Sequence, residues 1–346
     1  MSYQKRRLLS LVLVSLGCGL LPEASAQGGK LVIYSNSLSD GRGDWLTAEA
    51  KKAGFDIQLV DLGGADVTNR LIAERNNPIA DVVFGLNNVY FEKLKAANVL
   101  EKYKPNWASK VNASSADKDG QFWPIVKEPI MLVYNKAAYP NGKGAPTDWS
   151  DLWTKPQYKG KYEVATSLGG ATTQMVLSGI LSRYRDPKGD LGISDAGWKA
   201  IEAYYANGKP SIKGKDLYAR MKAGEINAGQ MWLAGKASRE KTYGVASQAA
   251  QPKIGVPMVF QHVAIIRNSK NEAQAKKFMD WFGSGAVQAQ WSQKFFTAPT
   301  NKDALAKANV TAVRMTNGFK AQKIDWGFVA SNLDKWIEKI ELQYLK

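Results

Sequence analysis

Residues that donate hydrogen bonds gather in four short segments, and each segment directly follows an apolar run of the sequence. The segments are residues 35–45, 62–66, 85–88 and 166–173. Hydroxyl, amide and glycine residues are also common in ordinary loops and helix caps, so one such segment alone carries little information. Four of them in comparable positions favour a shared polar cleft, because ligand sites gather a few convergent polar groups.

An anionic or zwitterionic solute is the ligand class that these segments suit. In open α/β sheets, ligands bind beyond the carboxyl ends of the strands, and helices that begin there offer free N–H groups and partial positive charge. Trp232 is either a stacking platform or a core residue, and the single histidine, His262, is either a ligand contact or a structural residue. The predicted ligand-binding residues are Ser35, Asn36, Ser37, Asp40, Asn87, Asn88, Tyr134, Ser167, Gly170, Thr172, Thr173, Gln230, Trp232 and His262.

Motifs typical of catalysis are missing from the sequence. It contains no Gly-x-Ser-x-Gly elbow, no His-Glu-x-x-His helix and no phosphate-binding loop motif. One histidine and one cysteine, Cys18, do not make a usual set of zinc ligands. We therefore predict no catalytic residues, no metal site and no cofactor. Carboxylates that are distant in sequence and meet in the fold leave one alternative open, an exported enzyme that uses acidic residues.

The elements that must position these segments alternate between strand and helix, which predicts an α/β fold. Unbroken apolar runs at residues 130–134 and 263–266 are typical of buried strands and bracket a middle section. We therefore expect two lobes, each a mixed sheet flanked by helices, hinged by crossover strands near Glu128 and His262. The other expected strands are 31–34, 57–60, 81–84 and 162–165, and the expected helices include 45–53, 67–75, 89–97, 172–184 and 326–345.

The first residues of the chain are typical of a cleavable signal peptide. Residues 5–7 are basic, residues 8–21 are apolar, and Ala-Ser-Ala at residues 24–26 fits the cleavage pattern. Lipid anchoring at Cys18 is the weaker alternative. We expect a periplasmic protein that begins near Gln27. The predicted domains are 1–26 as signal peptide, 27–128 as the first part of lobe 1, 129–261 as lobe 2, and 262–346 as the return to lobe 1 plus C-terminal helices.

The charge of the chain is strongly basic, with a formal net charge of +16. Its lysines are spread along the whole chain rather than gathered in a tail or block, which is typical of a solvated basic surface. We expect no nucleic-acid partner, because an exported protein rarely meets nucleic acid. Cleavage after residue 26 would remove Cys18, so the mature chain would have neither disulfides nor thiol chemistry.

A set of short motifs is spread over nearly the whole chain after the signal peptide. They lie at residues 32–35, 69–71, 77–83, 132–135, 146–152, 224–226 and 273–282. In these motifs the sequence resembles the periplasmic solute-binding proteins of ABC importers, in the family 1 branch of ferric-ion, thiamine and phosphonate binders. The resemblance implies a type II periplasmic binding fold and a monomer. Its two lobes would close around one solute and deliver it to a membrane permease with its ATPase, or signal through a receptor.

Ferric-ion binding fits the sequence poorly. Ferric binders of this branch typically place neighbouring tyrosines shortly after the Gly-Glu motif, where residues 230–233 of this chain contain no tyrosine. Tyr204 and Tyr205 are adjacent but lie in a helical pattern. Neighbouring positions on a helix diverge by about 100°, so the two phenols would hardly meet one ion.

Phosphonate or phosphate binding fits the sequence more broadly, and sugar phosphates satisfy the same logic. The chain is similar to binders of 2-aminoethylphosphonate at residues 34–35, 38–45 and 73–78. Hydroxyl-rich helix starts suit such an anion, and Asp40 or Glu128 could meet an ammonium group. Thiamine binders resemble the chain over residues 80–88 only, and Trp232 could hold their cationic ring.

Overall fold

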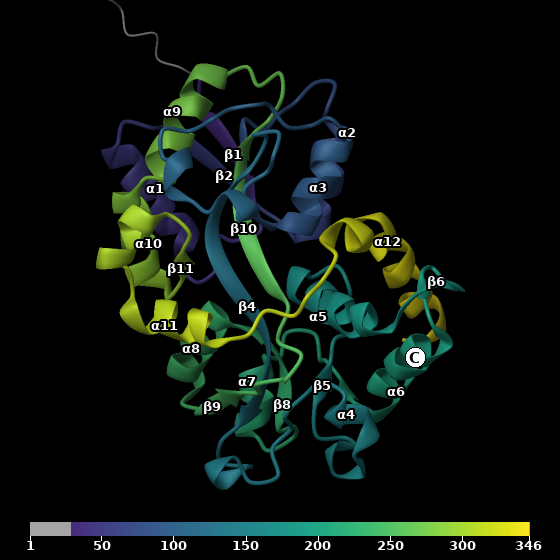
Figure 1. Ribbon diagram of the computed structural model, residues 1–346. Helices are drawn as coiled ribbons and strands as arrows, with labels where there is room; N and C mark the ends of the chain where they lie inside the picture. The colour runs from purple at the N-terminus through teal and green to yellow at the C-terminus, as the bar shows by residue number, and fades with distance from the viewer. Residues whose placement is uncertain (1–28, 346) are drawn as a thin grey trace, which may run out of the picture.

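The computed structural model describes residues 29–345, which form two lobes of mixed α/β structure (Figure 1). The predicted signal peptide, its cleavage after Ala26 and the alternative anchor Cys18 lie outside these residues. Within the described chain, no helix is both long and apolar enough to cross a membrane.

Lobe 1 is built on a mixed sheet in which the three strands at one end are parallel. Its elements are β1 (Leu31–Ser35), α1 (Arg42–Lys52), β2 (Ile57–Asp61), α2 (Gly64–Ala73), β3 (Val82–Asn87), α3 (Asn88–Ala96), α9 (Glu272–Phe282), α10 (Gly285–Phe295), β11 (Ala298–Pro299) and α11 (Val310–Gly318). β1 pairs in parallel with both β2 and β3, as strands joined by helices do. The helices bury apolar residues on both faces of the sheet, which makes two cores, one under α1, α9 and α10 and one under α2 and α3.

Two long strands run through both lobes and hold them together. They are β4 (Trp123–Asn135) and β10 (Met258–Ile265). The strands pair antiparallel, with Glu128 opposite Val259, and their register shifts between Gln261 and His262. In lobe 1, β10 also pairs with β3 and β4 pairs with β11. The crossover strands predicted near Glu128 and His262 are therefore present as β4 and β10, which belong to both lobes.

Lobe 2 continues from β4 and has two cores, a large one around α5 and α6 and a smaller one around α7. Its elements are α4 (Asp151–Thr154), β5 (Glu163–Val164), α5 (Ala171–Leu181), β6 (Arg185–Asp190), α6 (Asp195–Asn207), β7 (Lys209–Pro210), α7 (Leu217–Lys222), β8 (Ala228–Trp232), α8 (Leu233–Tyr243) and β9 (Ser247–Ala249). Short 3₁₀ turns connect elements of both lobes at Ala108–Lys110, Ala113–Ser115, Pro140–Gly142, Pro156–Tyr158, Ser182–Tyr184 and Lys302–Lys307. β8 and β9 pair antiparallel with the far half of β4. The ring of Tyr162 stacks on that of Tyr204 at 5.5 Å, and α5 lies almost wholly within the core.

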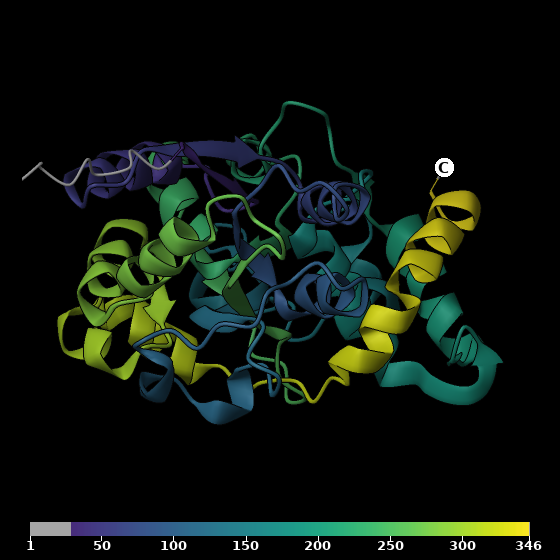
Figure 2. The same ribbon diagram turned by 90° about the horizontal axis from the view of Figure 1, so that it is seen from above.

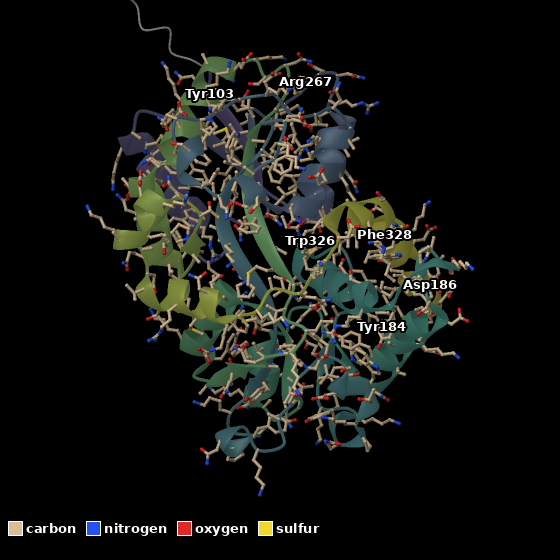
Figure 3. The ribbon with its side chains drawn as sticks, in the orientation of Figure 1. Tyr103, Tyr184, Asp186, Arg267, Trp326 and Phe328 are labelled. Atoms are coloured by element: carbon tan, nitrogen blue, oxygen red, sulfur yellow. The ribbon has the colours of Figure 1, made fainter. Side chains whose placement is uncertain are left out.

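The last helix, α12 (Trp326–Gln343), belongs to lobe 2. Leu333, Trp336 and Ile340 recur every three or four residues, so they share one face of the helix, and they pack into the lobe 2 core. Viewed from above, α12 runs beside the lobe 2 helices and away from α9 and α10 (Figure 2). Phe328, labelled in Figure 3 at the start of this helix, has its ring 5.5 Å from that of Trp336 and 4.3 Å from the guanidinium of Arg185. The predicted segment 262–346 is thus divided between the two lobes.

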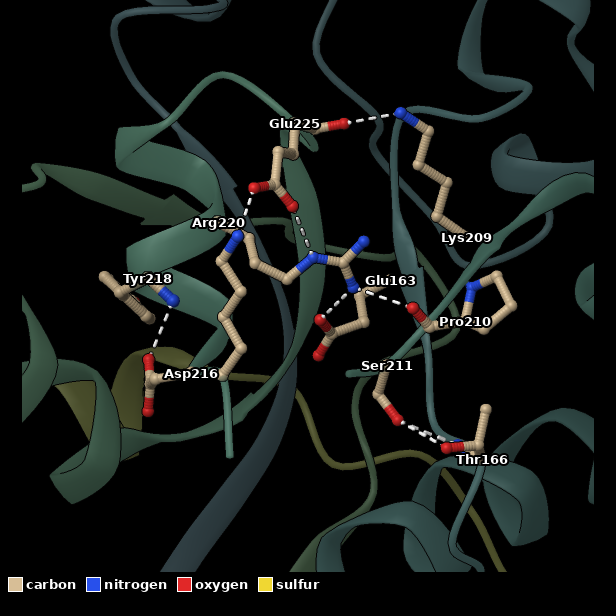
Figure 4. A network of polar contacts seen from close by, with 10 residues as sticks. Glu163, Thr166, Lys209, Pro210, Ser211, Asp216, Tyr218, Arg220 and Glu225 are labelled. Carbon is tan, nitrogen blue, oxygen red and sulfur yellow. Dashed lines mark hydrogen bonds and ion pairs between the residues drawn. The ribbon is translucent and has the colours of Figure 1, made fainter. Parts of the chain in front are cut away.

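A buried arginine fastens the small sheet of lobe 2 to α7 (Figure 4). The side chain of Arg220 is 4% exposed, and its guanidinium donates to the carboxylate of Glu163 at 2.6 Å and to that of Glu225 at 3.0 Å. It also donates to the Pro210 carbonyl at 2.8 Å. Burial raises the pKa of Glu163, and Arg220 acts in the opposite direction. One cation therefore links β5, β7 and the turn after α7.

His262 lies in the core of lobe 1 and not in the cleft that we predicted for it. It is 1% exposed, its ring packs 4.9 Å from that of Phe122, and its Nε2 lies 3.2 Å from the Ser115 carbonyl oxygen. Side chains alternate across a strand, so His262 points away from the face on which its neighbour Gln261 lies. Burial lowers the pKa of this imidazole to about 4.

Replacement of Arg220 with methionine should lower the free energy of unfolding by about 3–5 kcal/mol, because Glu163 would stay buried without its partner. Urea denaturation at pH 7 measures the loss. Lys215→Met is the matched control, since Lys215 is an exposed partner of the same Glu225, and we expect it to cost less than about 1 kcal/mol. Equal losses in the two variants would contradict the assigned role of Arg220.

His262 should make the stability of the protein depend on pH between about 6.5 and 4. The unfolded chain protonates this imidazole near pH 6.5 and the folded chain only near pH 4. The unfolded state binds more protons in that window, so the stabilisation is complete above about pH 6.5 and falls as the pH drops. As the pH falls from about 6.5 to 4, the free energy of unfolding of the wild-type protein should therefore drop by about 3 kcal/mol more than that of His262→Gln. Parallel pH profiles from urea denaturation of the two proteins would refute this.

Candidate ligand-binding cleft

A cavity of about 390 Å³ lies between the lobes, beside the crossing of β4 and β10. Lobe 1 contributes Asn36, Ser37, Ser39, Arg42, Leu62, Gly63, Gly64, Gly85, Asn87, Trp291 and Thr297, the crossing strands contribute Glu128, Ile130, Val259 and Gln261, and lobe 2 contributes Gly170, Ala171, Thr172, Met175 and Trp232. Polar groups come mainly from lobe 1 and the crossing, and apolar side chains complete the walls. The cavity therefore has the composition of a site for a small polar organic molecule.

The loop after β1 reaches the cavity because it packs tightly on the end of β3. The backbone N–H of Ser37 donates to the hydroxyl of Ser35 at 3.0 Å, which folds the loop back on the strand. Gly85 sits beneath it with a φ of +88°, and a Cβ there would lie 2.6 Å from that of Ser37. Glycine is needed here both for its backbone conformation and for the close approach. Ser35 thus supports the loop, and Asn36 and Ser37 face the cavity.

Arg42 supplies positive charge to the cavity. It is the first residue of α1 and is 7% exposed. Its guanidinium donates to the Ser39 carbonyl at 3.2 Å, contacts the carboxylate of Asp40 at 3.4 Å and lies 5.2 Å from the centre of the Phe295 ring. These contacts leave guanidinium donors available for an anion, because an arginine carries five N–H groups.

Two helices begin at the cavity from opposite lobes. The first bond within α2 runs from the Val67 N–H to the Gly63 carbonyl, and the first within α5 from the Gln174 N–H to the Gly170 carbonyl. The N–H groups before these have no acceptor inside their helices. Both helix starts line the cavity, so backbone donors and partial positive charge meet there from both sides. Gly64 is required at this point, because a Cβ would lie 2.5 Å from the Tyr90 ring.

Glu128 places a carboxyl group on the cavity wall at the crossing of the strands. It is 6% exposed and accepts a hydrogen bond from the side-chain amide of Gln261 at 2.8 Å. Burial raises the pKa of this carboxyl, and the positive charge of Arg42 acts in the opposite direction. The cavity therefore presents a cation and an enclosed acid to the same ligand.

The lobes touch each other on both sides of the cavity. On one side, Arg239 from α8 donates to Asp40 at 3.0 Å and lies 4.8 Å above the Trp232 ring. On the other side, the Tyr90 hydroxyl of α3 donates to the side-chain carbonyl of Gln174 on α5 at 2.6 Å. These contacts are direct, so the structure describes a closed arrangement of the lobes.

Six of the predicted residues line the cavity and three support it. The six are Asn36, Ser37, Asn87, Gly170, Thr172 and Trp232. Ser35 holds the first loop, and Gln230 donates to the Thr173 hydroxyl at 2.6 Å behind the start of α5. Asn87 also caps α3 by accepting from the Val89 N–H at 3.0 Å. The polar loops after β1 and β3 and before α5 thus converge, as the spacing predicts.

The other five predicted residues lie away from the cavity. The prediction that Tyr134 contacts the ligand is wrong. This residue lies six positions beyond Glu128 on β4, about 20 Å along an extended strand, and packs in the lobe 2 core. Ser167 is exposed. Asn88 is the first residue of α3, directly after the capping residue Asn87. Asp40 forms ion pairs with Arg42 and Arg239. His262 is the fifth, enclosed in lobe 1.

Several lining residues were not predicted as ligand contacts. Arg42 lies within the first polar segment, and Glu128 was expected only as one of two acids that could meet an ammonium group. Gln261 comes directly before His262, so the prediction misses by one residue on the correct strand. Trp291 and Thr297 reach the cavity from the C-terminal part of lobe 1, and no local motif marks them.

Groups that could hold a metal ion are not gathered in the part of the chain that the structure describes. No three of its histidine, cysteine, aspartate and glutamate side chains come together in that way. Tyr204 and Tyr205 both lie on α6 within the lobe 2 core, and no tyrosine is among the residues that line the cavity.

Comparison with known proteins places this cavity in a family. A family model described as bacterial extracellular solute-binding protein matches residues 77–332. The probable ABC transporter periplasmic-binding protein y4fP of Sinorhizobium fredii is 36% identical over 90% of this chain and 86% of its own. A putative 2-aminoethylphosphonate-binding periplasmic protein of Salmonella typhimurium is 24% identical over 89% of this chain and 90% of its own.

The fold also matches a solved structure. The apo ferric ion-binding protein A of Pasteurella haemolytica superposes with a TM-score of 0.75 at 18% identity, over 90% of this chain and 97% of its own. This likeness confirms the predicted type II periplasmic binding fold. The family is a non-enzymatic transport component, which sets the alternative of an exported enzyme aside. The chain belongs to the bacterial extracellular solute-binding proteins, as the periplasmic substrate-binding component of an ABC transporter.

Proposed function

We propose that this protein captures a small solute with a phosphonate or phosphate group, with 2-aminoethylphosphonate as the leading candidate, and delivers it to a membrane permease. One observation carries the proposal: Arg42 and the starts of α2 and α5 meet in a cavity where, among residues 29–345, Glu128 supplies the one lining carboxyl. A tetrahedral anion would accept from the guanidinium and from backbone N–H groups of both lobes. Its ammonium group would then lie beside the carboxylate of Glu128, where β4 and β10 pair.

Further donors support this orientation. The Thr297 hydroxyl is buried on the cavity wall and finds no hydrogen-bond partner within residues 29–345, so a ligand can satisfy it. Ser39 of lobe 1 and Thr172 of lobe 2 add hydroxyls on both sides. Trp232 and Trp291 supply apolar walls that suit the carbon skeleton of an organic solute. The name of the Salmonella relative points to the same ligand class.

Ferric ion is the second candidate, because the structural relative from Pasteurella is a ferric ion-binding protein. The cavity argues against it. Arg42 would repel a bare cation, and in the described part of the chain Glu128 is the single carboxyl that lines the cavity. A hard trivalent ion needs several oxygen anions around it, and neither tyrosines nor further acids supply them here. Thiamine, a cation, meets the same repulsion from Arg42.

Closure of the lobes would couple capture to delivery. Donors from both lobes meet one anion, so the bound ligand would favour the closed arrangement that the Asp40–Arg239 contact stabilises. The closed surface, made of both lobes, would then be presented to the permease and its ATPase. The cavity is complete within one chain, which supports action as a monomer. Release after Ala26, rather than anchoring at Cys18, stays a prediction that the mass of the mature protein decides.

Calorimetry on refolded, ligand-free protein should show binding of 2-aminoethylphosphonate, with weaker or no binding of a sugar phosphate, thiamine and ferric citrate. Arg42→Met should weaken binding of 2-aminoethylphosphonate by about 2–5 kcal/mol, at least about 30-fold in Kd, because a charge-assisted contact to the anion is lost. Arg75→Met is the control, since Arg75 is an exposed arginine of lobe 1 outside the cavity. Binding of iron alone, with a coloured protein, would overturn the proposal.

A further inference from the structure

Three side chains form an unbroken line of hydrogen bonds along the cavity wall. The Ser37 hydroxyl lies 3.3 Å from the side-chain carbonyl oxygen of Gln261, the shortest of three acceptor distances, with the Asn36 side-chain oxygen and the Gly85 carbonyl at 3.4 Å. The amide N–H of Gln261 donates to the Glu128 carboxylate at 2.8 Å. Each residue comes from a different element, namely the loop after β1, strand β10 and strand β4. All three line the cavity, so each can respond to what the ligand presents.

Arg42 is the charged group whose field acts on Glu128. On α8, the backbone N–H of Ala234 faces the carboxyl, and Lys236 is occupied by Glu240 at 2.8 Å. On β4, the neighbouring Lys127 donates to Asn317 at 3.3 Å. On β10, the neighbour of Gln261 is His262, enclosed in the lobe 1 core.

The protonation of Glu128 therefore depends on the positive charge of Arg42 and on the charge of the ligand in the cavity. An anion that occupies Arg42 removes the compensating charge, and closure removes the water. Both effects favour the neutral acid. An ammonium group beside the carboxyl would instead hold it ionised.

The side chain of Gln261 can couple the protonation of Glu128 to the hydrogen bond that Ser37 makes, because an amide has one donor end and one acceptor end. A carboxylate only accepts, so it takes the amide N–H, and the carbonyl end then takes up the hydroxyl proton of Ser37. The lone pairs of Ser37 are left for the cavity. A protonated Glu128 donates instead, which turns the amide over, so that Gln261 donates to Ser37 and frees the Ser37 proton for the ligand.

We propose that Glu128, Gln261 and Ser37 form a reversible relay that adapts the cleft to the charge of the ligand end it meets. With a zwitterionic aminophosphonate, Glu128 is ionised and Ser37 accepts from the ligand. With a phosphonate that lacks the amine, Glu128 takes up a proton from solvent and Ser37 donates. The relay rests on the proposed function and adds to it that Gln261 is a positioning residue and that the ligand class sets proton uptake.

Proton uptake tests the first part of the relay. Calorimetry near pH 7, in two phosphate-free buffers of different ionisation enthalpy, gives the protons taken up with 2-aminoethylphosphonate and with ethylphosphonate. Wild type should take up about one proton more with ethylphosphonate than Glu128→Gln does, and the two proteins should agree for 2-aminoethylphosphonate. Titration of the phosphonate itself is common to both proteins and cancels. Lys127→Gln, on the same strand but outside the cavity, should behave as wild type.

A double-mutant cycle tests the link through Gln261. Ser37→Ala and Glu128→Gln should be non-additive in their effect on the Kd of 2-aminoethylphosphonate by about fivefold or more, since they share one hydrogen-bonded line. In a Gln261→Met background the two effects should become additive to within about twofold. A merely structural Gln261 would weaken binding without changing this coupling.

Each outcome has a distinct meaning. Additive effects in the wild-type background, or equal proton uptake by wild type and Glu128→Gln with ethylphosphonate, would overturn the relay and leave the proposed function standing. If neither phosphonate binds the wild-type protein, both the relay and the proposed function are overturned. If 2-aminoethylphosphonate binds and ethylphosphonate does not, the relay is overturned and the proposed function stands. Thermal melts of every variant establish that each one is folded before its affinity is compared.

Discussion

The pairing of β4 with β10 is the constraint on which the rest of the structure depends. Both strands run through both lobes and form the floor of the cleft. Glu128 and Gln261 lie on that floor, on adjacent strands. The register of one antiparallel pair therefore decides which acid and which amide face the cavity, whereas the loops and helix starts of the two lobes decide which backbone N–H groups and hydroxyls face it.

Electrostatics explains why the site is charged yet enclosed. Removing a lone ion from water costs several kcal/mol, so buried ions need partners. Arg42 has Asp40 and a carbonyl on one side and the open cavity on the other. Glu128 has an amide and a backbone N–H but, within residues 29–345, no ion pair. Each group is therefore supported by the protein and still has hydrogen-bonding capacity on its cavity side.

Local sequence patterns predicted the strands and loops well and the side-chain directions less well. The alternation of apolar runs and polar segments reflects backbone hydrogen bonding and burial, which act over a few residues, so the polar loops after β1 and β3 converge with the start of α5. Tyr134 and His262 failed for reasons of direction and distance along a strand. Trp291 and Thr297 could not be found, because they approach from far along the chain and owe their place to helix packing. Arg42 lay within a predicted segment, yet only the fold shows its guanidinium on the cavity.

Asp40 connects the charge of the cavity to the contact between the lobes. Its carboxylate lies between two guanidinium groups, that of Arg42 on the cavity wall at 3.4 Å and that of Arg239 from the other lobe at 3.0 Å. Arg239 in turn covers Trp232, which lines the cavity. A charge placed on Arg42 therefore acts on the same carboxylate that holds the lobes together. Because opposite charges at such distances interact strongly in a poorly solvated cleft, ligand charge and lobe closure belong to one electrostatic system.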